Sequence, residues 1–510
     1  MMAGEMKNGV MLGQLLSDWL VIPDRFDCLI TSITQDSRTV RQGSLFLACS
    51  GATHHGLDFI NQVLDAGAAA VICEVGQGWT PERVESLAAS LETPLLMIDG
   101  LAAKLSTIAG HFYHHPTRDM TVIGVTGTNG KTSCAQFLAR ALSDERPCGV
   151  IGTLGNGFPD SMEESTHTTP DPILLQALLH ALHTQGAGAV AMEVSSHALD
   201  QSRVAHLHFD VAVLTNLSRD HLDYHGTLEA YGEAKKQLFY MSGLGCAVIN
   251  MDDPFGRELL NELPSAIKRI GYGIGKGTAE GIEVDCWIQA SAVESESGGM
   301  RIVIEGSWGA GELKTPLLGH FNVSNLLAVL AVLLHLDIPL NEALERLAKL
   351  RTVPGRMEHF GGGEQPLVVV DYAHTPDALE HVLMALREHA QKRLICLFGC
   401  GGDRDRGKRP LMGRVVERLA DLAIVTDDNP RGENGDRIVE EVLAGMEQPD
   451  KALVIRDRKQ AIAQVIAEAG IGDLILVAGK GHETVQIVAG EKLPFSDCEQ
   501  VVAALSKVGR

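Results

Sequence analysis

Short apolar runs separated by amphipathic stretches dominate the last third of the chain. Runs of four or five apolar residues are typical of strands buried on both faces of a parallel sheet, and they occupy 367–370, 394–398, 422–425, 452–455 and 474–477. The stretches between them read as helices, and Thr375-Pro376 is a favourable helix start. A βα series of this kind predicts a doubly wound, Rossmann-like parallel sheet.

The rest of the chain repeats this alternation of short strands and longer helices. Residues up to about 100 mix short strands and helices, for example at 43–48 and 67–72. Further strands are expected at 121–125, 189–192 and 211–214, and helices at 101–113 and 326–336. A length of 510 residues suggests about three domains. We place them at 1–100, 101–350 and 351–510, with 352–356 as the linker into the last one. The predicted fold class is α/β, with a central P-loop parallel-sheet domain and a C-terminal Rossmann-like domain.

Composition and charge exclude several kinds of partner. With 43 Lys+Arg against 65 Asp+Glu the net charge is −22, and such a field repels nucleic acid phosphates. The longest apolar segment, 326–336, is too short to span a bilayer, and the N-terminus has no secretion signal pattern. The ten cysteines form no CxxC pair, which favours a reducing compartment. We therefore expect a cytoplasmic monomer that acts on small molecules, with no nucleic acid partner and no membrane span.

A glycine-rich loop follows the strand expected at 121–125. The segment 125–132 reads VTGTNGKT and leads into an amphipathic helix. Backbone N–H groups of such a loop converge on phosphate oxygens, while Lys131 can reach the β- and γ-phosphates and the Thr132 hydroxyl can ligate Mg²⁺. The spacing departs from GxxxxGK[ST], because position 125 is valine. Strand, loop and helix still agree, so we predict a phosphate site on a variant P-loop; a glycine-rich turn with a solvated lysine is the alternative.

Acidic and imidazole side chains follow two further strands of the middle section. Glu193 ends the strand at 189–192, where a P-loop protein places an acidic residue near Mg²⁺. His221 lies in TNLSRDHLDYHG (215–226), which follows another strand and belongs at the same sheet edge. We predict a metal role for both; a surface glutamate and a structural histidine are the alternatives. Lys235, within a helical segment, reads by itself as a solvated lysine.

Four polar loops follow strands of the last section. They read DYAHTP (371–376), GCGGDRDRGKR (399–409), TDDNPR (426–431) and AGKGHE (478–483). In a parallel sheet these loops meet at the carboxyl edge, where substrates bind. Arg431, beside a proline-fixed turn, can grip a carboxylate in bidentate fashion, and the neighbouring acids and amide can bind an ammonium. Each loop alone could be an ordinary turn, but together they predict a crevice for a zwitterion.

The chain resembles the Mur ligases, the ATP-dependent amino-acid ligases of peptidoglycan synthesis. The segments that carry the resemblance extend over nearly the whole chain: DSR (36–38), TGTNGKT (126–132), HTTP (167–170), EVSSH (193–197), NLSRDHLDYHG (216–226), GHFNVSN (319–325), PGRME (354–358), DYAHTPD (371–377), DNPR (428–431) and GKGHE (479–483). The DNPR segment resembles the signature of the diaminopimelate-using branch, because the lysine-using branch differs there.

The resemblance implies a binding role for each matching position. For UDP-MurNAc-L-Ala-D-Glu the positions are Gln35, Ser37, Ala52, Thr53, His54, Thr168, Thr169, Ser195, Gln201 and Arg203. For ATP they are Gly127, Thr128, Asn129, Gly130, Lys131, Thr132, Ser133, Asn325, Arg356 and His374. For meso-diaminopimelate they are Arg404, Asp428, Asn429, Pro430, Arg431, Gly479 and Glu483.

The resemblance also gives Lys235 a chemical role. It matches a lysine that is carbamylated in the family, and the Tyr-x-x-Ala-Lys register favours it over Lys236. The implied Mg²⁺ ligands are Thr132, Glu193, His221 and Lys235 as its carbamate. The implied catalytic residues are Lys131, Lys235, Glu193 and His221.

The implied reaction uses ATP to activate a carboxylate. The D-glutamyl side-chain carboxylate attacks the γ-phosphate, and the amine of meso-diaminopimelate then attacks the resulting acyl phosphate. The first domain would bind the UDP-sugar, the central domain ATP and the last domain the incoming amino acid. Since the implied ATP ligands are spread over two domains, we expect the last domain to close over ATP.

Two other functions remain open on the residues alone. A folylpolyglutamate synthase-like ligase would share the ATP half but would not need the first domain or the DNPR loop. A non-enzymatic nucleotide-binding regulator would not need Glu193, His221 or a second, amino-acid-sized crevice. ATP binding without amino-acid-dependent turnover would support the regulator.

Overall fold

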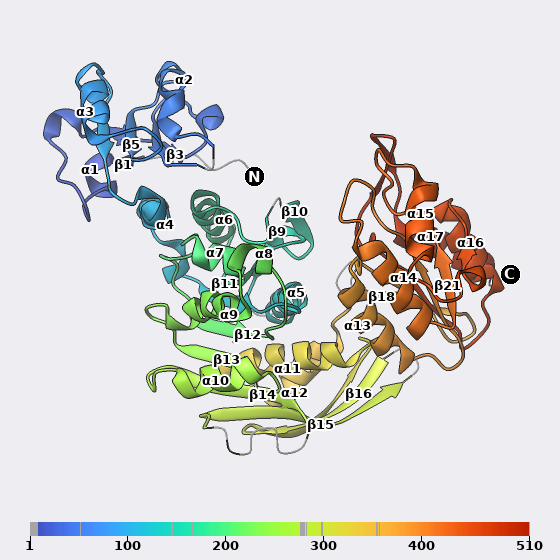
Figure 1. The fold of residues 1–510 in the computed structure, drawn as a ribbon. Helices are drawn as coiled ribbons and strands as arrows, with labels where there is room; N and C mark the ends of the chain where they lie inside the picture. Colours follow the sequence, from blue (N-terminus) through green and yellow to red (C-terminus); the bar gives the residue numbers. More distant parts are fainter. Residues whose placement is uncertain are drawn as a thin grey trace. The chain divides into compact units, whose positions relative to one another are not determined.

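The computed structural model describes residues 9–508, except 52, 144–145, 166, 276–280, 282, 297–298, 353–354 and 356. They form a mixed α/β fold with parallel sheets, as predicted, in two compact units (Figure 1). The first unit is Met1–Gly273 with Gly277–Ile288 and Ala328–Asp337; the second is Ile274–Lys276 with Gln289–Leu327 and Ile338–Arg510. The domain boundaries near residues 100 and 350 stay predictions.

The first unit begins with a small parallel sheet. Its order is β3-β4-β5-β6, formed by Ser32–Thr34, Ser44–Ala48, Ala70–Cys73 and Leu95–Met97. Alternate residues of β4 point to opposite faces, so Leu45 and Leu47 pack with α4 (Leu101–Phe112) while Phe46 packs with α2 (Ile60–Asp65). Other elements here are the antiparallel pair β1 (Val10–Met11) and β2 (Leu29–Ile30), α1 (Leu12–Leu15) and α3 (Pro81–Ala89).

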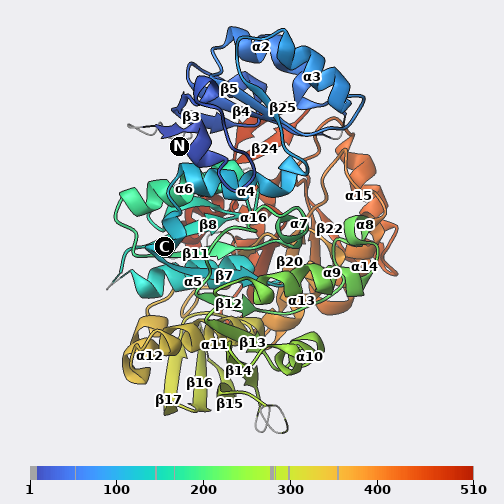
Figure 2. The same ribbon diagram turned by 90° about the vertical axis from the view of Figure 1, so that its left-hand side faces the viewer.

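A larger sheet of the first unit carries the glycine-rich loop (Figure 2). The strands of this sheet that belong mainly to the first unit are, in order, β10-β9-β8-β11-β7-β12-β13-β14, formed by Ser161–Glu163, Gly155–Phe158, Cys148–Gly152, Ala189–Glu193, Thr121–Thr126, Val211–Leu214, Cys246–Asn250 and Lys268–Ile274. Neighbouring strands from β8 to β14 are parallel, so their carboxyl ends share one edge. The strands predicted at 121–125, 189–192 and 211–214 are confirmed as β7, β11 and β12.

Helices of the first unit connect and cover these strands. They are α5 (Lys131–Leu142), α6 (Pro172–Thr184), α7 (Ser196–Asp200), α8 (Leu222–His225), α9 (Leu228–Lys236) and α10 (Pro254–Glu262). Leu175 and Leu182 of α6 and Leu259 of α10 belong to the core that packs against the strands. Burial of both sheet faces explains why the strands are continuous apolar runs.

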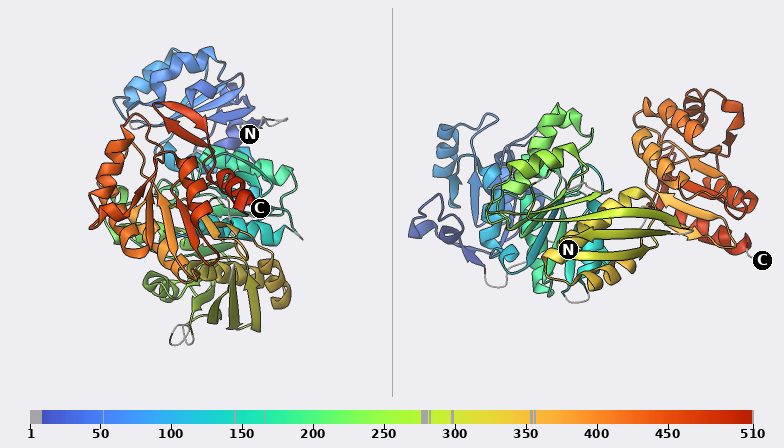
Figure 3. Two further views of the ribbon diagram at one scale, coloured as in Figure 1. Left: turned by 90° about the vertical axis from the view of Figure 1, so that its right-hand side faces the viewer. Right: turned by 90° about the horizontal axis from the view of Figure 1, so that it is seen from below.

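The second unit contains the predicted doubly wound sheet, drawn in orange and red in Figure 3. Its order is β18-β19-β23-β20-β21-β22, formed by Glu358–Gly361, Leu367–Asp371, Leu474–Ala478, Leu394–Phe398, Leu422–Val425 and Leu453–Val454. Only β18 is antiparallel to its neighbour. The four predicted polar loops therefore do follow strands that end at one edge of this sheet.

Both faces of this sheet are covered by helices. Core residues of α13 (Pro376–Arg387), α14 (Lys408–Leu419) and α15 (Gly435–Leu443) pack against one face. Core residues of α16 (Arg458–Glu468) and α17 (Asp497–Val508) pack against the other. Within β20, Cys396 and Ile395 belong to opposite faces, as strand alternation requires.

Several elements were not predicted. Among them are β15 (Cys286–Glu296), the antiparallel pair β16 (Gly299–Gly306) and β17 (Gly309–Thr315), α12 (Leu340–Ala348), β18, and the hairpin of β24 (Val485–Val488) and β25 (Glu491–Pro494). The apolar segment at 326–336 is largely buried and lies mostly within α11 (His320–His335). No helix among the described residues is both long and apolar enough to cross a membrane. The cytoplasmic location and the monomeric state stay predictions.

His115 makes the stability of the first unit sensitive to acid. Its backbone is left-handed (φ 49°), and its ring centroid lies 5.2 Å from that of His111. Burial, followed by the charge of Arg118, lowers the pKa of His115 to about 4, whereas an unfolded chain has a histidine pKa of about 6.5. The unfolded chain thus binds the proton more tightly. The stability contributed by neutral His115 is complete above about pH 6.5 and is lost as the pH falls towards about 4.

We expect the free energy of unfolding to fall between about pH 7 and about pH 5, and to fall less in His115→Gln than in the unsubstituted protein. The slope of the free energy of unfolding against pH must differ between the two proteins by less than ~1.4 kcal/mol per pH unit, the limit for one proton. Urea titrations at the two pH values measure it. His381→Gln, whose side chain is 70% exposed, is the matched control, and an unchanged pH dependence in His115→Gln would contradict the assignment.

Candidate active site

The predicted phosphate loop joins β7 to α5 in the first unit. Gly127 (φ 143°) and Gly130 (φ 85°) have backbone conformations that other residues rarely adopt. A Cβ atom at Gly127 would lie 1.9 Å from Thr215 Oγ1, so only glycine fits there. The loop leads directly into α5, whose N-terminus provides free N–H groups and the positive end of a helix dipole. These are the features of an anion site.

The end of β12 holds this loop in place. Thr128 N donates to Asn216 O at 2.9 Å, and Asn129 N donates to Asn216 Oδ1 at 2.9 Å. Thr215 Oγ1 donates to Asn129 O at 2.6 Å. Thr215 and Asn216 were not predicted as site residues. Their position directly after a strand was a signal, but only the strand order places them beside the loop.

Two lysines converge on one carbonyl of the loop. Lys131 Nζ and Lys235 Nζ each donate to Gly127 O at 2.9 Å. Lys235 is 1% exposed, and its Nζ lies 4.2 Å from the ring centroid of Tyr231. Burial, followed by the charge of Lys131, lowers the pKa of Lys235 well below its ordinary value. The side chain is therefore an amine that loses its proton readily, not the solvated lysine that the sequence alone suggested.

The neighbouring Lys236 has different surroundings. Its Nζ donates to Glu262 Oε2 at 2.8 Å and pairs with Glu233 Oε1 at 3.0 Å. Consecutive residues of a helix point in different directions, which accounts for the separation. The geometry thus places Lys235, and not Lys236, against the phosphate loop.

The Glu193 carboxylate lies beside the first turn of α5. It accepts hydrogen bonds from Thr132 Oγ1 at 2.9 Å, from Thr153 N at 2.7 Å and from Thr153 Oγ1 at 3.2 Å. Burial raises the pKa of Glu193, although Lys131 and these hydrogen bonds act in the opposite direction. Thr153 was not predicted, and no local pattern in the sequence marks it. The pair of Thr132 and Glu193 brings two oxygen donors together.

His221 lies at the start of α8 with a left-handed backbone (φ 51°). Its ring centroid is 4.9 Å from that of His197 and 6.1 Å from that of Tyr231, and its side chain is 48% exposed. Across the described part of the chain, no group of three or more His, Cys, Asp or Glu side chains could hold a metal ion. The predicted metal role of His221 stays a prediction.

Residues predicted for the dipeptide form a connected group near Glu193. Thr169 Oγ1 donates to Glu193 O at 2.8 Å, and Ser195 N donates to Thr169 Oγ1 at 3.1 Å. Arg203 Nη1 donates to Thr169 O at 2.8 Å, and its Nε donates to Gln201 Oε1 at 3.1 Å. The hydroxyls of Thr168 and Thr153 lie 3.0 Å apart. Hydrogen bonds thus link this group to the phosphate loop through Thr153, Glu193 and Thr132.

The residues predicted for the UDP-sugar lie after neighbouring strands of the small sheet. Gln35 and Ser37 follow β3, and Thr53 and His54 follow β4. Because β3 and β4 are parallel, both loops lie at the same sheet edge. Gln35, Thr53 and His54 are exposed and Ser37 is half-buried, so they are open to a ligand. Ala52 lies outside the described residues.

Two of the predicted ATP residues belong to the second unit. Asn325 is buried in α11, where its Nδ2 donates to Asn322 Oδ1 at 3.2 Å. His374 follows β19; its Nδ1 lies 2.7 Å from Tyr372 O, and its own carbonyl accepts a hydrogen bond from Lys408 Nζ at 2.8 Å. Arg356 lies outside the described residues. Ser133 is in the first turn of α5, within the first unit.

The residues predicted for the amino acid come together at the carboxyl edge of the second sheet. Asn429 Nδ2 donates to Glu483 Oε2 at 2.9 Å, and a Cβ atom at Gly479 would be 3.7 Å from Asp428 Oδ1. Arg431 Nη1 donates to Gly402 O at 2.9 Å, which joins the DNPR loop to the loop of Arg404. Pro430 is buried and Arg404 is exposed. Three loops separated in sequence thus form one polar cluster.

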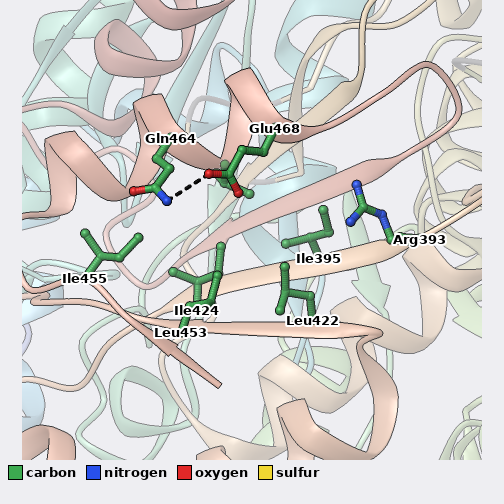
Figure 4. Close-up of a pocket in the computed structure, with 9 residues that line it drawn as sticks. Arg393, Ile395, Leu422, Ile424, Leu453, Ile455, Gln464 and Glu468 are labelled. Carbon is green, nitrogen blue, oxygen red and sulfur yellow. Dashed lines mark hydrogen bonds between the residues drawn. The ribbon is translucent and has the colours of Figure 1, made fainter. Parts of the chain in front are cut away.

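A cleft elsewhere in the second unit is not a competing site. It lies between α16 and β20, β21 and β22 (Figure 4), and is lined by Arg393, Ile395, Leu422, Ile424, Leu453, Ile455, Gln464, Val465 and Glu468. Most of this lining is aliphatic, and Arg393 is already paired with Asp473 at 2.6 Å. None of the predicted site residues contributes to it. The convergent polar groups lie at the ends of the strands instead.

Comparison with protein families identifies the chain. The model of the Mur ligase family, catalytic domain, matches residues 29–113; that of the Mur ligase middle domain matches 125–333; and that of the Mur ligase, glutamate ligase domain, matches 355–481. The chain belongs to the Mur ligase family. The predicted resemblance is thereby confirmed, and the Mur ligase models match regions that contain the phosphate loop and the residues of the second unit's polar cluster other than Glu483.

Similar proteins place this Mur ligase more narrowly. It is 52% identical over 480 residues to the UDP-N-acetylmuramoyl-L-alanyl-D-glutamate–2,6-diaminopimelate ligase of Ectopseudomonas mendocina, with 94% of this chain and 95% of that protein covered. It is 47% identical over 503 residues to the protein of the same name from Coxiella burnetii, with 98% and 100% covered.

Solved structures agree with this placement. A structure of a UDP-N-acetylmuramoyl-L-alanyl-D-glutamate–2,6-diaminopimelate ligase has a TM-score of 0.74 and 34% identity, and covers 98% of this Mur ligase and 100% of its own chain. The folylpolyglutamate synthase of Mycobacterium tuberculosis in complex with ADP and AMPPCP has a TM-score of 0.57 and 18% identity, and covers 74% and 92%. The second likeness is one of fold alone.

Proposed function

We propose that this Mur ligase joins meso-2,6-diaminopimelate to the D-glutamyl side-chain carboxylate of UDP-MurNAc-L-Ala-D-Glu, with conversion of ATP to ADP and phosphate. The observation that carries the proposal is the polar cluster of Asp428, Asn429, Arg431 and Glu483 in a chain that also contains a phosphate loop. Relatives about half identical over nearly the whole chain carry the corresponding name. A nucleotide-binding regulator would not need the second cluster.

The first step of the reaction would take place at the phosphate loop. The D-glutamyl carboxylate attacks the γ-phosphorus of ATP; a carbon–oxygen–phosphorus link forms, and the bond to the β-phosphate oxygen breaks to release ADP. Lys131 and the N–H groups of the loop neutralise the charge that develops on the transferred phosphoryl group. The hydrogen bonds that connect Thr168, Thr153 and Glu193 support binding of the D-glutamyl carboxylate next to the loop.

The second step forms the amide. The neutral amine of diaminopimelate attacks the acyl carbon, and phosphate leaves from the tetrahedral intermediate. The amine must lose a proton, which passes to a base or to the departing phosphate. Holding the amine and the acyl phosphate in contact provides most of the rate increase, because it replaces an encounter in solution.

The residues around Glu193 fit a bound Mg²⁺. Thr132 and Glu193 place a hydroxyl and a carboxylate oxygen 2.9 Å apart, and hard divalent cations prefer oxygen donors of this kind. We assign Thr132, Glu193, His221 and Lys235 as its holders. When bound with ATP, the ion adds positive charge beside the phosphates.

Carbamylation of Lys235 is supported by its surroundings. A carbamate forms when a neutral amine attacks carbon dioxide and releases a proton, and the buried Lys235 beside Lys131 is such an amine. The product is an anion, so the modification places a negative charge beside the cationic Lys131. A carbamate at this position also offers oxygen atoms to a metal ion.

The amino-acid cluster suits a molecule with two amine–carboxylate ends. Arg404 and Arg431 are assigned to carboxylates, and Asp428 and Glu483 to the distal ammonium. Lysine lacks the distal carboxylate, so it would leave an arginine unpaired. We assign the UDP-sugar to residues 1–100, ATP to 101–350 and the amino acid to 351–510.

Phosphate release from ATP tests the proposal. The protein is supplied with ATP and UDP-MurNAc-L-Ala-D-Glu, with meso-diaminopimelate or L-lysine in parallel reactions. We expect release with diaminopimelate only. Release with lysine only would support the ligase activity but refute the assignment of the DNPR loop to diaminopimelate. No release with either amino acid would favour a folate-type ligase or a nucleotide-binding regulator.

A further inference from the structure

Lys480 lies at the centre of the amino-acid cluster but was not among the predicted site residues. Its side chain is fully buried. Its Nζ donates to Glu483 Oε2 at 2.8 Å and to Asn429 Oδ1 at 3.1 Å, and lies 4.0 Å from Asp428 Oδ1. One ammonium group therefore contacts three residues assigned to the incoming amino acid.

The hairpin of β24 and β25 also makes hydrogen bonds to the DNPR loop. Gln486 Nε2 donates to Asp428 O at 2.8 Å, and Ile487 N donates to Asn429 Oδ1 at 2.9 Å. Arg431 N donates to Ile487 O at 3.0 Å. The DNPR loop is thus fixed through both its backbone and its side chains, which lets Arg431 keep a left-handed backbone (φ 51°).

The carboxylates around Lys480 outnumber the cations, which favours the binding of one more cation. Arg458 is fully buried and paired with Asp497 at 2.6 Å, so Lys480 remains opposite the two carboxylates of Asp428 and Glu483. Asp428 Oδ1 is buried and has no hydrogen-bond partner among the described residues. A buried carboxylate oxygen without a donor is costly, and a ligand ammonium would supply the donor.

Lys480 also favours the charged forms of the two acidic side chains. Burial would raise the pKa of Glu483, but hydrogen bonds from Lys480 and Asn429 outweigh it, and the pKa lies below its ordinary value. Burial raises the pKa of Asp428, and Arg458 and Lys480 limit that rise. Without Lys480, buried Asp428 and half-buried Glu483 would lose a cation that they share, which favours uptake of a proton.

We propose that Lys480 and Gln486 are positioning residues that hold Asp428, Asn429 and Glu483 in place for the ammonium group of the incoming amino acid. They act through these three residues and do not touch the reacting atoms. The proposal rests on the proposed function, since it assigns the affinity for the amino acid to this network. A purely structural ion pair would change stability without a selective change in affinity.

Steady-state kinetics of Lys480→Met and Gln486→Met test the proposal. Both replacements keep a side chain of similar length and remove its hydrogen-bond donors. We expect Lys480→Met to raise KM for meso-diaminopimelate about 10- to 100-fold, the range for a lost hydrogen bond to a charged group. KM for ATP and for UDP-MurNAc-L-Ala-D-Glu should stay within about twofold. Gln486→Met should show the same selectivity with a smaller rise.

Lys492→Met is the matched control, because Lys492 is an exposed residue of the same hairpin. Thermal unfolding of each variant shows whether it is folded. If Lys480→Met does not fold, Gln486→Met decides, and an unchanged KM for diaminopimelate in it overturns the proposal. Equal changes in all three KM values, or a loss of kcat alone, also overturn it. Absence of diaminopimelate-dependent turnover in the unsubstituted protein would instead refute the proposed function.

Discussion

Replacing Lys235 by alanine will lower kcat by about 10²- to 10³-fold, whereas replacing Lys236 will leave it within about twofold. Lys235 Nζ donates to the Gly127 carbonyl of the phosphate loop, while Lys236 Nζ pairs with Glu262 and Glu233. Loss of the first removes a group from the proposed site of phosphoryl transfer. Loss of the second removes only ion pairs with partly exposed glutamates. Amino-acid-dependent phosphate release measures both.

The two adjacent lysines provide a matched comparison within one helix. Both variants shorten a lysine of α9 to alanine, so a general effect of removing a long side chain from this helix would change them equally. An NMR signal from ¹³C-bicarbonate that is present in the unsubstituted protein and in Lys236→Ala, but absent in Lys235→Ala, would demonstrate the carbamate. Full activity of Lys235→Ala would contradict the catalytic assignment.

Replacing Arg431 by alanine will reduce the preference for meso-diaminopimelate over L-lysine by about 100-fold. Arg431 is assigned to a carboxylate that lysine lacks. In the unsubstituted protein, bound lysine would leave this partly buried guanidinium without its partner, and that cost is the source of discrimination. Alanine removes the cost, so kcat/KM for diaminopimelate falls while kcat/KM for lysine is unchanged or rises.

Arg437→Ala is the control for this experiment. Arg437 pairs with Glu441 at 3.5 Å on α15, and its side chain is 64% exposed. The ratio of kcat/KM values for the two amino acids should therefore be the same in this variant as in the unsubstituted protein. An unchanged ratio in Arg431→Ala would refute the assignment of Arg431, and it would leave the ligase reaction itself in place.

Local patterns in the sequence were sufficient for the elements that bear the site. Strands at 394–398 and 422–425 were predicted with the bounds of β20 and β21. Short continuous apolar runs bounded by polar loops are typical of buried strands, which is why the prediction succeeded here. The strands β15 to β17 and the hairpin of β24 and β25 were missed. Their burial alternates or is low, so they lack that signal.

By itself, the sequence determined that a phosphate loop and four polar loops exist and that each follows a strand, since these are properties of neighbouring residues. The partners of each side chain were decided by the tertiary structure. Lys235 reaches a carbonyl 108 positions away, and Lys480 reaches Asn429 across 51 positions. Such contacts depend on strand order and on burial, which the local pattern does not encode. Burial also changes the chemistry, because removal from water turns two ordinary lysines into an amine of lowered pKa and a buried ion-pair centre.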